Sequence, residues 1–113
     1  MPPKNNPLKL NPLQLRTLTL FQALARIPGA GHALPGGEML IRQIPDAHGD
    51  HFHLGDAVVA GKDATGLTNE AVWNALTRKG LARAEYPREF ILTAEGLAYD
   101  TGATNAILQQ SSH

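Results

Sequence analysis

The stretch "NPLQLRTLTLFQALARIPG", residues 11–29, constrains the fold more than any other part of this sequence. Asn11 can cap the first turn of a helix, and Pro12 suits the first helical position, where its missing N–H costs no hydrogen bond. Pro28 and Gly29 mark the end of this helix. One apolar stripe at helical spacing is formed by Leu13, Leu20, Phe21, Leu24 and Ile27.

Two further leucines, Leu15 and Leu18, lie off this stripe. A helix that is apolar over so wide an arc needs cover on more than one side. The sequence therefore predicts a central core helix, or one that also forms part of a homodimer interface.

The composition is that of one domain. The chain has 113 residues, of which 42% are hydrophobic, and ten basic side chains balance ten acidic ones. Any binding of nucleic acid must therefore come from a local patch rather than from the overall charge. The absence of cysteine excludes disulfide bonds and thiolate zinc sites. Because no apolar run suits a membrane span or a signal peptide, we expect a soluble, cytoplasmic protein with no membrane partner.

The chain divides into three parts by composition. Residues 1–10 are rich in proline and predict a flexible arm, in which Leu8 and Leu10 are able to dock on another surface. Residues 11–102 are the predicted domain. Residues 103–113 predict a tail that is disordered or weakly helical.

The first half of the domain predicts a loop and a hairpin. Four glycines and two prolines favour a loop over residues 28–37. The runs "EMLIRQIP" and "HFHL", separated by "DAHGD", predict a β-hairpin over about residues 39–54. Residues 56–61 fit either a short helix or a strand.

The second half predicts a helix, a hairpin and a short helix. Thr68 is the expected cap of a helix over about residues 68–79, which Gly80 ends. "LARAEYPREFILT" predicts a hairpin with "YPRE" at its tip. Thr93 then caps the short helix.

This order resembles a winged helix-turn-helix, the DNA-binding part of bacterial regulators of the MarR and PadR types. The pattern is an apolar residue four positions before a helix-ending glycine, then "KGL", a charged hairpin and "LT..G". The matching residues, within about 54–100, are Leu76, Lys79, Gly80, Leu81, Leu92, Thr93 and Gly96. The whole chain also resembles a family of short proteobacterial proteins. The predicted fold class is α+β, a winged helix-turn-helix with a long N-terminal helix and an extra β-hairpin before the motif.

The resemblance implies DNA binding in transcription regulation, with the helix over residues 68–79 in the major groove. Asparagine can pair with adenine, arginine can reach guanine, and basic side chains on the hairpin can hold phosphates. Trp73 is expected in the core, half-buried, rather than against a base. The predicted contacts with duplex DNA are Lys62, Thr68, Asn69, Asn74, Thr77, Arg78, Arg83 and Arg88.

The same side chains also fit the solvated faces of an ordinary small domain. Residues 62–90 carry five basic and four acidic side chains, which is a small surplus for binding a phosphate backbone. The alternative function is therefore a winged-helix module that binds another protein, or a second copy of itself, without DNA.

The stretch "HGDHFHLGD", residues 48–56, admits two interpretations. On a strand, His51 and His53 point one way and Phe52 and Leu54 point the other. In the preferred interpretation Phe52 and Leu54 are buried and the histidines are at the surface, so no metal or other cofactor is predicted. In the other, His51 and His53 are two ligands of zinc or iron, with a third among His48, Asp50 and Asp56.

Catalysis has little support in this sequence. The glycine-rich stretch "GAGHALPGG" lacks the Lys-Ser/Thr ending and the preceding strand of a phosphate loop. The two serines, Ser111 and Ser112, lie in the tail, away from any plausible base. We therefore expect a protein that is not an enzyme.

Overall fold

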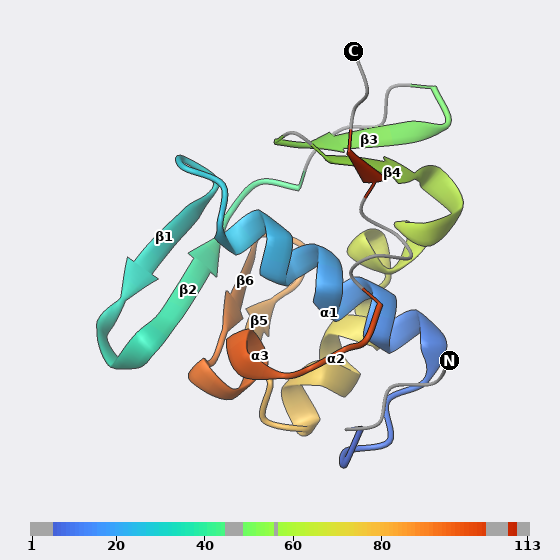
Figure 1. The fold of residues 1–113 in the computed structure, drawn as a ribbon. Coiled ribbons are helices and arrows are strands. Elements are labelled where there is room, and N and C mark those ends of the chain that lie inside the picture. Colours follow the sequence, from blue (N-terminus) through green and yellow to red (C-terminus); the bar gives the residue numbers. More distant parts are fainter. Residues whose placement is uncertain (1–5, 45–48, 56, 104–108, 111–113) are drawn as a thin grey trace.

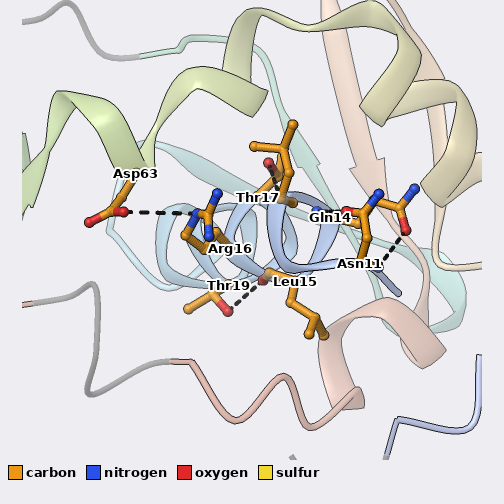
Figure 2. Close-up of polar contacts among 8 residues, drawn as sticks. Asn11, Gln14, Leu15, Arg16, Thr17, Thr19 and Asp63 are labelled. Atoms are coloured by element: carbon orange, nitrogen blue, oxygen red, sulfur yellow. Dashed lines mark hydrogen bonds and ion pairs between the residues drawn. The ribbon is translucent and has the colours of Figure 1, made fainter. Parts of the chain in front are cut away.

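The long first helix begins where the sequence predicts. Helix α1, Pro12–Ala25, is capped by Asn11, whose side-chain oxygen accepts a hydrogen bond from the Gln14 N–H at 2.8 Å. The Gln14 side chain in turn accepts from the Asn11 N–H at 3.0 Å, which completes a capping box (Figure 2). The cap thus satisfies two backbone donors at the exposed end of the helix.

The structure is a computed structural model that describes residues 6–44, 49–55, 57–103 and 109–110. These residues form a mixed α+β fold with two sheets and three α-helices: α1, α2 (Glu70–Arg78) and α3 (Ala94–Ala98). Three short 3-10 helices connect them: η1 (Pro35–Gly37), η2 (Gly61–Asp63) and η3 (Thr65–Thr68). Within this described part, no helix has the length and apolar character needed to cross a membrane.

The larger sheet has four antiparallel strands. Its order is β1 (Gly31–Leu34), β2 (Glu38–Ile41), β6 (Glu89–Leu92) and β5 (Ala82–Glu85). The smaller sheet consists of β3 (His51–Leu54), β4 (Ala57–Ala60) and the short β7 (Gln109–Gln110). In Figure 1, α1 crosses the middle of the molecule, the smaller sheet lies above it, and α2 and α3 lie below it.

An aromatic cluster joins α1, α2 and the larger sheet. Phe21 of α1 stacks on Phe90 of β6, with ring centroids 3.7 Å apart. Trp73 of α2 meets both rings edge-on, at 5.5 Å and 5.2 Å. All three side chains are at most 1% exposed. Edge-to-face and offset contacts of this kind add to the free energy already gained by burying the rings.

Helix α1 is covered on nearly every side within a single chain. Leu15 is 8% exposed and Leu18 is fully buried. On another side, the Gln22 amide donates to the carbonyls of Gly96 and Tyr99, and the hydroxyls of Thr19 and Thr101 are hydrogen-bonded. The core interpretation of this helix is therefore confirmed. Leu15 and Leu18 do not provide the free apolar face on which the homodimer was predicted.

Two of the predictions for residues 28–54 are wrong. The expected loop contains strand β1, because "PGG" at residues 35–37 is the turn of a hairpin that pairs β1 with β2. The expected hairpin over residues 39–54 does not form: β2 pairs with β1 and β6, whereas β3 pairs with β4. The ambiguous segment 56–61 contains strand β4. The turn "DAHG" lies mostly outside the described residues.

Other predictions in the second half are confirmed. The hairpin β5–β6 has residues 86–88 at its turn, and Thr93 caps α3 by accepting from the Gly96 N–H at 3.0 Å. The strands pair in register from Ala82 with Leu92 to Glu85 with Glu89. Hairpin and caps are specified by residues close together in the sequence, so a local pattern was sufficient to predict them.

The ends of the chain make contacts with the domain where they are described. Leu10 is 4% exposed and belongs to the core, and the Leu8 backbone bonds to the Tyr99 hydroxyl and to the Lys79 ammonium group. Residues 6–10 of the predicted arm are thus held against the domain. In the predicted tail, residues 109–110 pair with β4, and residues 104–108 and 111–113 lie outside the description.

Helix η3 passes so close to α1 that Gly66 has no room for a side chain. A Cβ atom at Gly66 would lie 1.8 Å from Thr17 Oγ1 and 3.0 Å from Thr17 Cβ. We expect Gly66→Ala to lower the free energy of unfolding by about 1–3 kcal/mol through overpacking. Urea unfolding followed by the fluorescence of the buried Trp73 measures this loss. Thr17→Ala removes the clashing hydroxyl, so the double variant should lose less than the sum of the two single losses. Strict additivity would contradict this account.

Candidate functional site

The start of α2 is held by Asn69 rather than by the predicted Thr68. The Asn69 side chain accepts a hydrogen bond from the Ala71 N–H at 3.0 Å. Thr68 is the last residue of η3, and its carbonyl accepts from the Tyr86 hydroxyl at 2.8 Å. The cap lies one residue later than predicted because η3 continues to Thr68. Threonine and asparagine are both good capping residues, so the sequence alone did not distinguish them.

Helix α2 separates an apolar inner face from a polar outer face. Trp73 faces inward and donates its indole N–H to the Leu67 carbonyl at 3.1 Å, so its predicted place in the core is confirmed. The exposed predicted contacts on the other face are Asn74, Thr77 and Arg78. Glu70 is exposed beside them and places a negative charge in the first turn.

Tyr86 fixes the turn of the β5–β6 hairpin beside the start of α2. Its ring packs edge-on against Trp73 with centroids 4.8 Å apart, and its hydroxyl donates to the Thr68 carbonyl. Arg88 lies two residues further along in the same turn and is exposed. The structure therefore brings the hairpin turn and the first turn of α2 together.

Arg83 is engaged by a carboxylate within the chain. Its Nη2 and Nε atoms both donate to Glu38, the latter at 3.3 Å, and the pair spans the central strand β6. Hydrogen bonding and the charge of Glu38 raise the pKa of the Arg83 guanidinium above its ordinary value. A guanidinium held in this bidentate way has fewer donors left for a phosphate.

The other basic side chains predicted to contact DNA lie on three separate parts of the chain: Arg78 on α2, Arg88 in the hairpin turn and Lys62 in η2. Within the described part of the chain, no ion pair involves Arg78 or Arg88. Lys79 instead donates to the Leu8 carbonyl at 2.8 Å. Lys62 lies in η2, which packs beside η3 and α1 and not beside the hairpin. Next to Lys62, Asp63 approaches Arg16 of α1 at 3.9 Å (Figure 2).

The histidines of β3 form a close pair. The Nε2 atoms of His51 and His53 are 3.2 Å apart, and His51 Nδ1 is 3.3 Å from a carboxylate oxygen of Asp50. The strand alternates as predicted: His53 is exposed and His51 is half-buried on one face, whereas Leu54 is 4% exposed on the other. Phe52 packs against the core but stays partly exposed.

The predicted metal-ligand set is only partly brought together. His48 and Asp56 lie outside the described residues. Among the residues that are described, no group of three or more histidine and acidic side chains is arranged to hold a metal ion. What the described part places side by side is the pair His51 and His53, with Asp50 behind His51.

A cavity of about 740 Å³ opens next to His53. It lies where the end of α1, the segment that follows β2 and strand β3 come together. The residues that line it are Leu24, Ile27, Pro28, Gly29, Ala30, Gln43, Ile44, His53 and Gly55. The sequence analysis did not anticipate this cavity, because its walls come from segments that are distant along the chain.

Comparison with known proteins leaves the chain without a match. It fits no protein-family profile, and no curated protein or solved structure is significantly similar to it.

Two residues that shape the region around α2 and the β5–β6 hairpin were missed by the sequence analysis. Tyr86 was assigned only to a hairpin tip, and Glu38 was assigned only to a strand. The sequence carries a weak signal for Tyr86, since an aromatic residue in a turn rich in charge needs cover for its ring. It carries none for Glu38, which lies 45 residues from Arg83.

The Tyr86 hydroxyl gives a direct test of the contact between turn and helix. Tyr86→Phe keeps the ring on Trp73 and removes the hydrogen bond to Thr68. We expect a loss of about 0.5–1.5 kcal/mol in the free energy of unfolding, which is the net contribution of one such hydrogen bond to stability. Tyr86→Ala should cost more because the ring contact is lost as well. Urea unfolding measures both, and equal losses for the two variants would mean that the ring contributes nothing.

Proposed function

We propose that this protein is a winged helix-turn-helix DNA-binding protein that acts in transcription regulation. The observation that carries the proposal is the contact between the hairpin turn and the start of α2 through Tyr86 and Thr68. The order of α1, η3, α2 and the β5–β6 hairpin along the chain supports it. The pairing of β6 with β2 supports it further, because it anchors the hairpin in a larger sheet.

In this proposal α2 enters the major groove with its polar face. Asn74 and Arg78 are exposed on that face and carry the donors that read base edges. Arg88 in the hairpin turn contacts a backbone phosphate. Arg83 is left out of the contact set because Glu38 occupies its guanidinium.

The number of cations on this face limits the affinity. Each phosphate that is neutralised releases counterions, and this release supplies most of the binding that does not depend on sequence. With Arg78 and Arg88 as its main cations, one motif binds weakly. Two motifs on a two-fold axis double the contacts and reach half-sites about 34 Å apart.

The alternative is a module that binds protein and not DNA. It is favoured by the contacts that Arg83 and Lys79 make within the chain, with Glu38 and with the Leu8 carbonyl. The Glu38 carboxylate neutralises Arg83, and the hydrogen bond to the Leu8 carbonyl holds the Lys79 ammonium group, which keeps its charge, against the N-terminal segment. The experiment below separates the two functions.

The test is the salt dependence of binding to labelled duplex DNA, measured by fluorescence anisotropy. We expect weak binding at low salt, with Arg78→Ala and Arg88→Ala each weakening it and each lowering the slope against the logarithm of salt by about one. Arg83→Ala is the matched control, an arginine of the same hairpin, and should leave both affinity and slope unchanged. Trp73 is buried, so its fluorescence is not used to detect the DNA.

Two results would reject DNA binding. One is the absence of binding to any duplex at low salt. The other is binding that survives the simultaneous loss of Arg78 and Arg88. Either result would favour the protein-binding module.

We propose that the regulator is a homodimer. One motif has few cations and binds weakly, whereas two motifs double the contacts with DNA. Sedimentation velocity at micromolar concentration should give a single species of twice the mass of the chain. A single species of chain mass would contradict this. In that case a duplex with two half-sites would bind no more tightly than a duplex with one.

A further inference from the structure

The pair of histidines on β3 lies outside the proposed DNA-binding face, and its geometry is that of two ligands on one metal ion. Two imidazole nitrogens at about 2.0–2.1 Å from a tetrahedral zinc ion are separated by about 3.3 Å. The Nε2 atoms of His51 and His53 are 3.2 Å apart. The two rings meet edge to face at 82°, with their centroids 4.9 Å apart.

The contact with Asp50 orients the first of these ligands. The His51 Nδ1 atom lies 3.3 Å from an Asp50 carboxylate oxygen, so the proton of a neutral His51 belongs on Nδ1 and its lone pair on Nε2. A ligating histidine nearly always donates its other ring N–H to a carboxylate, a backbone carbonyl or a water molecule. Asp50, His51 and a metal ion would form such a chain.

The position of the proton on His53 follows from the tautomer of His51. With a lone pair on His51 Nε2, the 3.2 Å contact is a hydrogen bond only when His53 carries its proton on Nε2. A metal ion takes the place of that proton, and His53 then carries its own proton on Nδ1. The exchange leaves both imidazoles neutral, which is the form that binds metal.

The strand pair holds the two ligands in register. His51 lies opposite Ala60 and His53 opposite Val58 in the β3–β4 ladder. The Gly61 N–H donates to the Asp50 carbonyl at 2.7 Å, which fixes the backbone just before His51. On the other face Leu54 is buried and Phe52 packs against the core, so both histidines are kept on the outer face of the strand.

From these contacts we propose that His51 and His53 bind a divalent transition-metal ion of the zinc and copper(II) class, with Asp50 as the positioning residue behind His51. Imidazole nitrogens favour these ions, whereas magnesium and calcium prefer oxygen ligands. His53 also lines the cavity next to the end of α1.

The first experiment measures zinc affinity of the untagged full chain by competition with a chelating dye. We expect His51→Ala and His53→Ala each to weaken binding by about tenfold or more, and Asp50→Asn to weaken it by about tenfold. His32→Ala is the matched control, an exposed histidine on strand β1, and should bind zinc as the unaltered chain does. Equal affinity in all of these proteins would overturn the proposal, as would the absence of binding at millimolar zinc.

A second measurement identifies the ligands directly. Electron paramagnetic resonance of the copper(II)-loaded chain should show coupling to two imidazole nitrogens, and each of His51→Gln and His53→Gln should leave one. An unchanged spectrum in either variant would overturn the assignment. Circular dichroism melting of each variant establishes that it is folded, and the glutamine substitutions keep the size and polarity of these surface side chains.

Discussion

The aromatic contact of Phe21, Phe90 and Trp73 is the interaction on which the rest of the structure depends. These rings come from α1, β6 and α2, and they meet at the point where the larger sheet and two helices share one core. Because protein interiors are close-packed, a ring missing from any of the three elements cannot be compensated by small movements of the others. The position of α2, and with it the outer face proposed for DNA, follows from Trp73 lying edge-on to both phenylalanine rings.

What the sequence predicted well was specified locally. The cap at Asn11, the cap at Thr93 and the β5–β6 hairpin each involve residues that are close together in the sequence. What it predicted badly was the choice of strand partners. Strand β2 pairs with β6, about fifty residues later, and no pattern within residues 38–41 distinguishes that partner from β3. Each of these strands is four residues long, so alternation alone indicates a strand without indicating its neighbour.

The candidate site was also predictable from the sequence only where its residues depend on near neighbours along the chain. The exposed face of α2 was predictable from the spacing of Val72, Trp73 and Leu76, which fixes the inner side of the helix. The ion pair of Arg83 was not predictable, because its carboxylate partner is the first residue of β2, far away in the sequence. A count of charges along the sequence treats every arginine as available to a ligand. In the folded chain, Arg83 is in a bidentate ion pair, whereas Arg78 and Arg88 form no ion pair with the described residues.

The two proposed sites lie on opposite sides of α1, which decides how far one can influence the other. The histidine pair belongs to the smaller sheet above this helix, and the outer face of α2 lies below it (Figure 1). Helix α1 touches both regions by its side chains, since its Leu24 lines the cavity next to His53 while its Phe21 packs against Trp73. A shift of α1 in its tightly packed core would therefore be one route from a bound metal ion to the face proposed for DNA. Since the histidines are on the solvent side of their strand, binding there needs no such shift, and the two activities should be independent.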